Sequence, residues 1–176
     1  MVGTPRMNIA TIEDVAGVYE GEVFNGKRHG RGKLWLREGG HYEGDWRDGE
    51  LNGYGIQFDK DGYKLYEGQF VKGKREGSGI AYNTIISSFL DTKQLGIEVL
   101  GKDKGCWSKY EGSFVENKWS GVGKLYFKNQ DMYYGEFKND KVTGKGTLYR
   151  HSGEVVHGNW EDNRLVNQVK ELVISK

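Results

Sequence analysis

The chain has 176 residues, of which 36% are hydrophobic and 28 are glycine, and its formal charge at pH 7 is +1. This near-zero charge argues against a surface built for nucleic acid, which requires clustered cations. Aromatic residues make up 13% of the chain, too many for a disordered protein, and the single cysteine, Cys106, has no partner for an internal disulfide. No apolar N-terminal run resembles a signal peptide or a spanning helix, so we expect a cytoplasmic protein.

Residues 1–16 precede the first repeat, and 1–6 resemble a cloning remnant that has no bearing on the fold. From there the chain repeats itself about every 23 residues. A Tyr-Glu-Gly triplet opens four repeats, at 19–21, 42–44, 66–68 and 110–112, and recurs in altered form at 133–135 and 156–158. The first and third residues of each triplet are called its anchor position and its anchor glycine. In the first five of these repeats, a Gly-x-Gly follows with its glycines nine and eleven residues after the anchor glycine.

Each repeat is predicted to be a β-hairpin. Tyr42-Glu43-Gly44-Asp45-Trp46 alternates with the period of a strand, and a second strand follows the Gly-x-Gly. Five residues after each anchor glycine stands a residue type that tolerates a left-handed backbone, which predicts the positive-φ position of the turn. This column consists of Gly26, Gly49, Gly73, Asn117, Asp140 and Asn163.

Three columns hold most of the aromatic residues: the anchor tyrosine, the residue four positions later and an aromatic sixteen positions after the anchor. Because sixteen is even, we expect all three columns on one face of the sheet, with small anchor glycines leaving room for the rings. The rings are interpreted mainly as packing residues that also line a groove for a protein partner. The candidate groove residues are Tyr42, Trp46, Phe58, Tyr66, Phe70, Tyr82, Tyr110, Phe114 and Tyr126. The glutamates of the triplet are expected on the opposite, solvated face.

The pattern Tyr-Glu-Gly-x-(Phe/Trp)-x-x-Gly-x-x-x-Gly-x-Gly resembles the MORN repeat (membrane occupation and recognition nexus) over about 19–83 and 110–164. The resemblance implies an all-β fold, a single elongated and twisted antiparallel sheet of tandem hairpins that is often curved into a groove. It also implies scaffolding, protein binding and sometimes lipid association in cytoskeletal, ciliary and junctional settings. The chain departs from the pattern at Val23, which replaces an aromatic, and at Val156-His157-Gly158, a terminal half-repeat without Gly-x-Gly.

Two segments break the pattern. Residues 84–109 are either an inserted loop or hairpin or a degenerate repeat, and the likeness of 96–99 to 55–58 favours strands there. A contact with a specific partner is the functional alternative for this segment. In 165–176, apolar residues at Leu165, Val169, Leu172 and Val173 have the spacing of one helix face, which predicts a short helix that caps the array. An amphipathic segment that docks on a partner is the alternative.

No catalytic constellation emerges, so we predict no enzyme, no metal and no cofactor. None of the four histidines has a Cys or His at ligand spacing. The glycines of 73–79 resemble a phosphate-binding loop, but the Gly-Lys-Ser/Thr ending is missing and the same spacing recurs in every full unit.

Two kinds of binding remain. In the first, a protein partner lays a helix or an extended segment into the aromatic groove. In the second, anionic lipid binds a rim of basic residues that directly follow the turns. The rim consists of Lys27, Lys74, Lys118, Lys141 and Arg164, which alternatively only keep the turns soluble. Homo-oligomerisation is left open.

Overall fold

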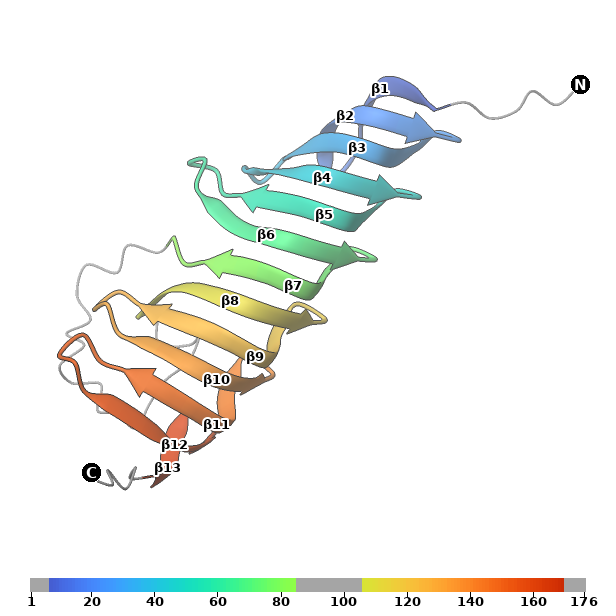
Figure 1. Cartoon of the computed structure of the whole chain (residues 1–176). Coiled ribbons are helices and arrows are strands. Elements are labelled where there is room, and N and C mark those ends of the chain that lie inside the picture. Colours follow the sequence, from blue (N-terminus) through green and yellow to red (C-terminus); the bar gives the residue numbers. More distant parts are fainter. Residues whose placement is uncertain (1–6, 85–105, 170–176) are drawn as a thin grey trace, which may run out of the picture. The chain divides into compact units, whose positions relative to one another are not determined.

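The computed structural model describes residues 7–84 and 106–169, which fall into two compact units divided after Thr84. Every regular element in these residues is a β-strand, so the predicted all-β class is confirmed (Figure 1). In each unit the strands follow one another in chain order and pair antiparallel with their neighbours, as expected for tandem hairpins. Continuity of one sheet through both units stays a prediction.

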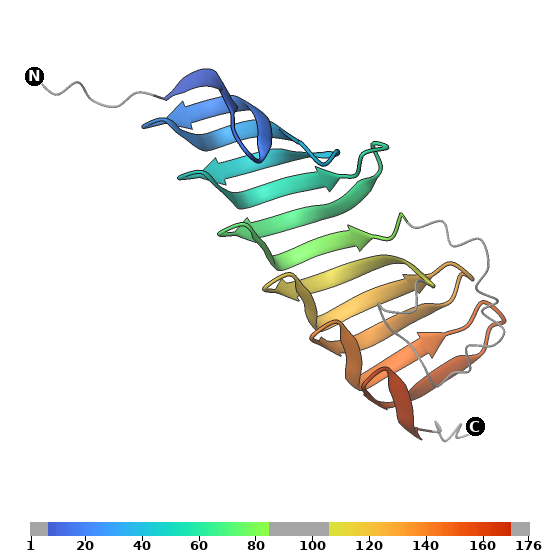
Figure 2. The same cartoon turned by 180° about the vertical axis from the view of Figure 1, so that it is seen from behind.

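The first unit has seven strands: β1 (Asn8–Glu13), β2 (Gly17–Phe24), β3 (Lys27–Leu36), β4 (His41–Arg47), β5 (Glu50–Phe58), β6 (Lys64–Val71) and β7 (Lys74–Tyr82). Strand β1 lies in the stretch that the repeat pattern assigns to a lead-in, and it pairs with β2 from Asn8↔Val23 to Glu13↔Val18 (Figure 2). The repeat pattern gives no sign of β1, because an edge strand needs only one paired side and this one carries no anchor motif.

The second unit has six strands: β8 (Trp107–Val115), β9 (Lys118–Phe127), β10 (Met132–Lys138), β11 (Lys141–Tyr149), β12 (Val155–Glu161) and β13 (Arg164–Gln168). Strand β13 corrects the predicted helical cap, because 164–168 are extended and complete the half-repeat as a hairpin. Leu165 pairs with Trp160, and its Cδ1 occupies the space that a Cβ on Gly158 would need. The remainder of the predicted cap and most of the 84–109 segment lie outside the described residues.

The hairpin turns contain two residues, both with positive φ, which is the type I′ geometry that suits strand twist. Asn25 (φ 49°) and Gly26 (φ 72°) form the first of them. The predicted turn column is therefore confirmed at all six positions, and the residue before it shares the left-handed backbone. In the second unit the turn side chain has a further role, since the backbone N–H of Val142 donates to Asn163 Oδ1 at 2.7 Å.

Glycines form an unbroken row across each unit. In the first unit, direct strand pairs join Gly21, Gly32, Gly44, Gly55, Gly68 and Gly79. The anchor tyrosine rings lie flat over this row. A Cβ on Gly32 would come within 2.3 Å of the Tyr19 ring, and one on Gly146 would lie 2.0 Å from the Tyr133 hydroxyl. These positions therefore require glycine for close approach of the ring.

We call the side of the sheet that carries the anchor tyrosines the tyrosine face. Its rings alternate edge to face, with Tyr42 lying 5.2 Å from Trp46 and 5.3 Å from Phe70 between ring centroids. The Tyr66 hydroxyl donates to the backbone carbonyl of Gln69 at 3.0 Å, and equivalent bonds recur in three other repeats. All five anchor tyrosines are at most 2% exposed.

A column of residues outside the repeat motif covers these rings. Nine residues after each anchor position stand Arg28, Leu51, Arg75, Trp119, Val142 and Leu165. The Arg75 guanidinium lies 4.6 Å from the centroid of the Tyr66 ring, and Trp119 stacks on Tyr110 at 4.5 Å. The tyrosine face is therefore closed by its own hairpin tips. The constant spacing of these mostly large side chains is the signal that would have revealed them.

Candidate binding surface

The nine predicted groove residues do not share a face. Six of them, Tyr42, Trp46, Tyr66, Phe70, Tyr110 and Phe114, are buried in the core of the tyrosine face. The aromatic column sixteen residues after the anchor, which supplies the other three, lies on the opposite face. The prediction of a single aromatic groove is thus wrong in its geometry.

The reason is the parity of strand pairing. A two-residue turn pairs Phe24 with Lys27, so paired residues are an odd number of positions apart. The register shift after the anchor glycine adds two residues to one strand, so the number of positions between paired residues stays odd. Tyr19 therefore pairs with Leu34, fifteen positions later. Because directly paired residues share a face, the residue at sixteen points the other way.

The opposite side, which we call the glutamate face, carries charged and aromatic side chains together. Phe58 stacks on His41 with ring centroids 4.3 Å apart, and the 38%-exposed Trp35 lies 4.9 Å from Lys33 Nζ. In the second unit Lys109 Nζ lies 4.2 Å from the centroid of the Tyr126 ring. This face therefore offers partly exposed rings, which the tyrosine face does not.

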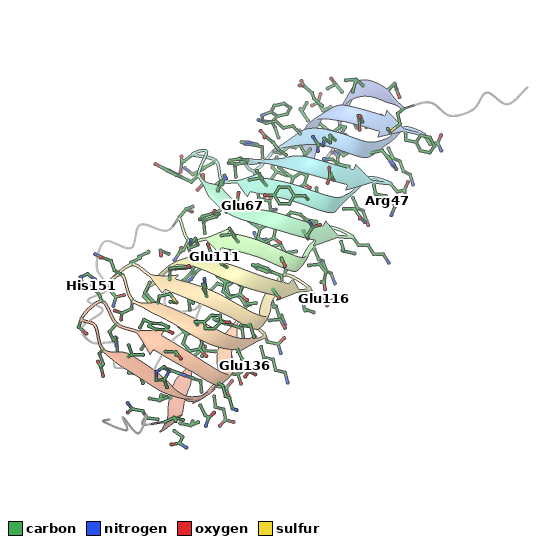
Figure 3. The ribbon with its side chains drawn as sticks, in the orientation of Figure 1. Arg47, Glu67, Glu111, Glu116, Glu136 and His151 are labelled. Carbon is green, nitrogen blue, oxygen red and sulfur yellow. The ribbon has the colours of Figure 1, made fainter. Side chains whose placement is uncertain are left out.

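Three glutamates of the triplet are held in place by neighbours on the glutamate face. Lys64 Nζ lies 2.7 Å from Glu67, and the Tyr82 hydroxyl donates to the same carboxylate at 2.5 Å. The hydrogen bond from Lys64, and then that from Tyr82, holds the pKa of Glu67 below its usual range. Glu111 repeats this arrangement with Lys109 and Tyr126; Figure 3 labels both glutamates. Glu43 is held by Lys33, at 2.6 Å.

A groove of about 730 Å³ crosses β2 to β5 on the glutamate face of the first unit. The glycine row forms its floor. The residues that flank each glycine form two walls. On one side of the glycine row the wall consists of Glu20, Lys33, Glu43 and Ile56, and on the other side it consists of Arg31, Asp45 and Tyr54. We call this feature the glycine-floored groove.

Charges in the groove are mostly paired. Lys33 bonds to Glu43, and Arg31 Nε lies 3.8 Å from Asp45 Oδ1. Asp45 also accepts the backbone N–H of Tyr54 at 2.9 Å, which fixes the strand where the 48%-exposed Tyr54 ring projects. The groove can therefore contact a ligand through charges, an aromatic ring and backbone.

The predicted lipid rim lies at the hairpin tips, where its residues open the second strand of each hairpin. Acidic residues share those tips in the second unit. Lys141 Nζ forms an ion pair with Asp162 at 2.9 Å, and Glu116 stands beside Asn117 in its turn (Figure 3). The tips of the second unit thus carry both signs of charge, and lipid binding stays a prediction.

The described residues contain no cluster of three or more His, Cys, Asp or Glu side chains arranged to hold a metal ion. Nor does any helix within 7–84 or 106–169 have the length and apolar content needed to span a bilayer. Cys106 is buried at 3% exposure.

The repeat geometry has a counterpart among known families. The MORN repeat model matches 19–41, 42–62, 66–82, 110–132 and 133–155, more than half of the chain. The chain belongs to the MORN repeat family. MORN repeat-containing protein 3 of Xenopus laevis is 39% identical to it over 67 residues, which cover 35% of this chain and 28% of that protein. The chain therefore matches under a third of that relative's length.

Proposed function

We propose that this chain is a non-enzymatic scaffold or adaptor that binds a protein partner on the glutamate face of its MORN repeats. One observation carries the proposal. The tyrosine face is closed by its own hairpin tips, whereas the glutamate face keeps partly exposed rings and the glycine-floored groove. Tyrosine and tryptophan are enriched among the residues that dominate protein interfaces, and polar groups form the rim around them.

The proposal replaces the aromatic groove expected from the sequence with the opposite face. A partner cannot reach Tyr42 or Trp46 without opening the core, because these side chains are 2% and 4% exposed. Trp35 and Tyr54 are reachable on the glutamate face. A cytoplasmic location with cytoskeletal or ciliary association, as the family resemblance implies, is part of the proposal and is checked by fractionating cells that express the protein.

The test is affinity capture with immobilised protein, cross-linking and peptide identification, comparing Tyr54→Ser with the parent chain. Tyr63→Ser is the matched control, because Tyr63 is also an exposed tyrosine (63%) but lies in the turn between β5 and β6. We expect Tyr54→Ser to lose the captured partner at an unchanged melting temperature, and Tyr63→Ser to keep it. Equal capture by both folded variants would exclude the groove as the contact.

A further inference from the structure

The wall of the glycine-floored groove contains one carboxylate that the protein leaves unpaired. Glu43, Glu67 and Glu111, the other glutamates of the triplets, each hold a lysine. Glu20 is exposed, and within the described residues its side chain makes no hydrogen bond or ion pair. Its cross-strand neighbour Lys33 turns instead to Glu43 at 2.6 Å. Glu20 is therefore available to pair with a positive group from outside the chain.

The far end of the groove is apolar. Ile56 on β5 continues the wall that begins with Glu20, and Tyr54 stands across the glycine row with 48% of its surface exposed. Between these ends lies the satisfied pair of Lys33 and Glu43. The groove thus runs from an unpaired carboxylate, over a neutralised charge pair, to an apolar end.

The width of the groove selects an extended ligand. Its walls are the residues on either side of each glycine, two positions apart on a strand, or about 6.7 Å between Cα atoms. An α-helix with its side chains is about 10–12 Å across, too wide to reach the glycine floor. An extended backbone fits between the walls.

The length of the groove sets the spacing of the ligand's side chains. Four strands at about 4.8 Å place Glu20 and Ile56 about 14 Å apart. Four residues of extended chain cover about 13 Å, and residues i and i+4 point to the same side. If a basic residue of the ligand faces Glu20, the ligand residue four positions away therefore faces Ile56.

We propose that the glycine-floored groove binds an extended protein segment that carries a lysine or arginine and, four residues away, an aliphatic side chain. The basic group pairs with Glu20, and the aliphatic group packs against Ile56 and Tyr54. Residues between them cross the Lys33–Glu43 pair and are small or polar. The inference rests on the proposed function, because it names the chemistry of the segment that the glutamate face recognises.

The test uses synthetic peptide libraries and the full chain. One library has the form X-Arg-X-Thr-X-Val-X, a second has the reverse order, and matched libraries replace Arg by Gln. Titrations are followed by the amide resonances of Gly21, Gly32 and Gly44, which report on the groove floor. We expect the Arg libraries to bind about fivefold more tightly than the Gln libraries, the size of one charge-assisted contact at a partly exposed site.

Two variants keep the test specific. Glu20→Gln is expected to bring the Arg-to-Gln affinity ratio close to one without changing the melting temperature, because Glu20 supports no contact in the fold. Glu50→Gln, the same change at an exposed hairpin-tip position of β5, is expected to keep the fivefold ratio.

Each contrary result has a distinct meaning. Equal affinity of Arg and Gln libraries, with shifts at the groove glycines, would overturn recognition of a cation but leave a protein-binding glutamate face. If no library shifts the amide resonances of the groove glycines, binding of an extended segment in the groove would be overturned. Failure of the proposed function itself would appear instead in the capture experiment, as a parent chain that captures no protein partner.

Discussion

The anchor tyrosine shows how one residue type serves two needs of this fold. Its ring lies over paired glycines, and its hydroxyl donates to a backbone carbonyl three residues later, at 3.0 Å for Tyr66 and Gln69. The bond satisfies a hydroxyl that would otherwise be buried at a cost in stability. Phenylalanine could supply the packing alone, whereas the tyrosine hydroxyl adds this bond at four of the five anchor tyrosines.

We predict that Tyr66→Phe lowers the free energy of unfolding by about 1 kcal/mol, the typical contribution of a hydrogen bond. Tyr63→Phe, in an exposed turn, is expected to have no effect. Burial raises the pKa of Tyr66 to about 12. The tyrosine therefore stabilises the fold fully below its unfolded pKa near 10, and this contribution is lost as pH rises toward 12. Urea unfolding at pH 7 and pH 11 measures both effects, and an unchanged stability at pH 7 would contradict the role of the hydroxyl.

A second prediction at the scale of the residue concerns Glu67. Its pKa is lowered by Lys64 and then by Tyr82, so its stabilising contribution is present above the unfolded pKa near 4.5 and is lost as pH falls through the folded value. Glu67→Gln should destabilise the protein by about 1 kcal/mol at pH 7, and the difference from the parent should vanish near pH 3. Thermal melts across this range test it, with Glu50→Gln as the control. A difference that persists at pH 3 would point to packing instead.

At the scale of the element, the hairpin is set by its turn. Both turn residues have positive φ, which costs little for glycine and asparagine and much for β-branched residues. In the second unit the turn side chain also accepts a backbone N–H of the preceding hairpin, as Asp140 does from Trp119 at 2.9 Å. In the first unit, Gly49 and Gly73 have no turn side chain and make only the backbone bond, which Gly73 N–H donates to Leu51 O at 3.0 Å.

We therefore predict opposite outcomes for two substitutions at Gly73 (φ 76°), where an added Cβ meets no atom within 4 Å. Gly73→Val should destabilise by more than about 1 kcal/mol through backbone strain alone. Gly73→Asn should be neutral or stabilising by up to about 1 kcal/mol, because its Oδ1 can accept the Leu51 N–H. Urea unfolding curves distinguish them. Equal damage from Val and Asn would mean that φ does not limit this turn.

At the scale of the whole molecule, the tyrosine face provides stability and the glutamate face is available for contact. The tyrosine face holds the core of each unit, and the glutamate face holds charges and partly exposed rings. The basic rim of the second unit is interrupted by Glu116, Asp140 and Asp162 in the same turns. Such mixed tips weaken attraction to an anionic surface, which depends on uninterrupted positive charge.

We accordingly predict that the protein sediments equally with phosphatidylcholine vesicles that contain or lack phosphatidylserine, at low and at high salt. The measurement is the bound fraction in each pellet, and a polybasic peptide serves as the positive control. Binding that needs phosphatidylserine, is released by salt and is weakened by Lys27→Gln with Lys74→Gln would contradict this and establish the lipid adaptor.

Much of this architecture could be predicted from residues alone. The spacing of Tyr-Glu-Gly and Gly-x-Gly predicted the hairpins, and Gly, Asn or Asp at one column predicted the positive-φ turns, because local backbone sterics decide both. The edge strand β1 was missed because its pairing with β2 is a tertiary contact without a local motif. The predicted helix was wrong over 165–168, because pairing of Leu165 with Trp160 outweighed a helix-like spacing.

The sequence by itself thus determined the repeat, the turns and the glycine row, since each depends on the steric needs of a few adjacent residues. Only the tertiary structure decided which face meets solvent. The register shift beside the glycine row adds two residues to one strand, whereas a shift of one would have moved Trp35 to the tyrosine face. It also decided that Arg75 and Trp119 cover the tyrosines, because that contact forms only when the hairpin tip lies over its own core.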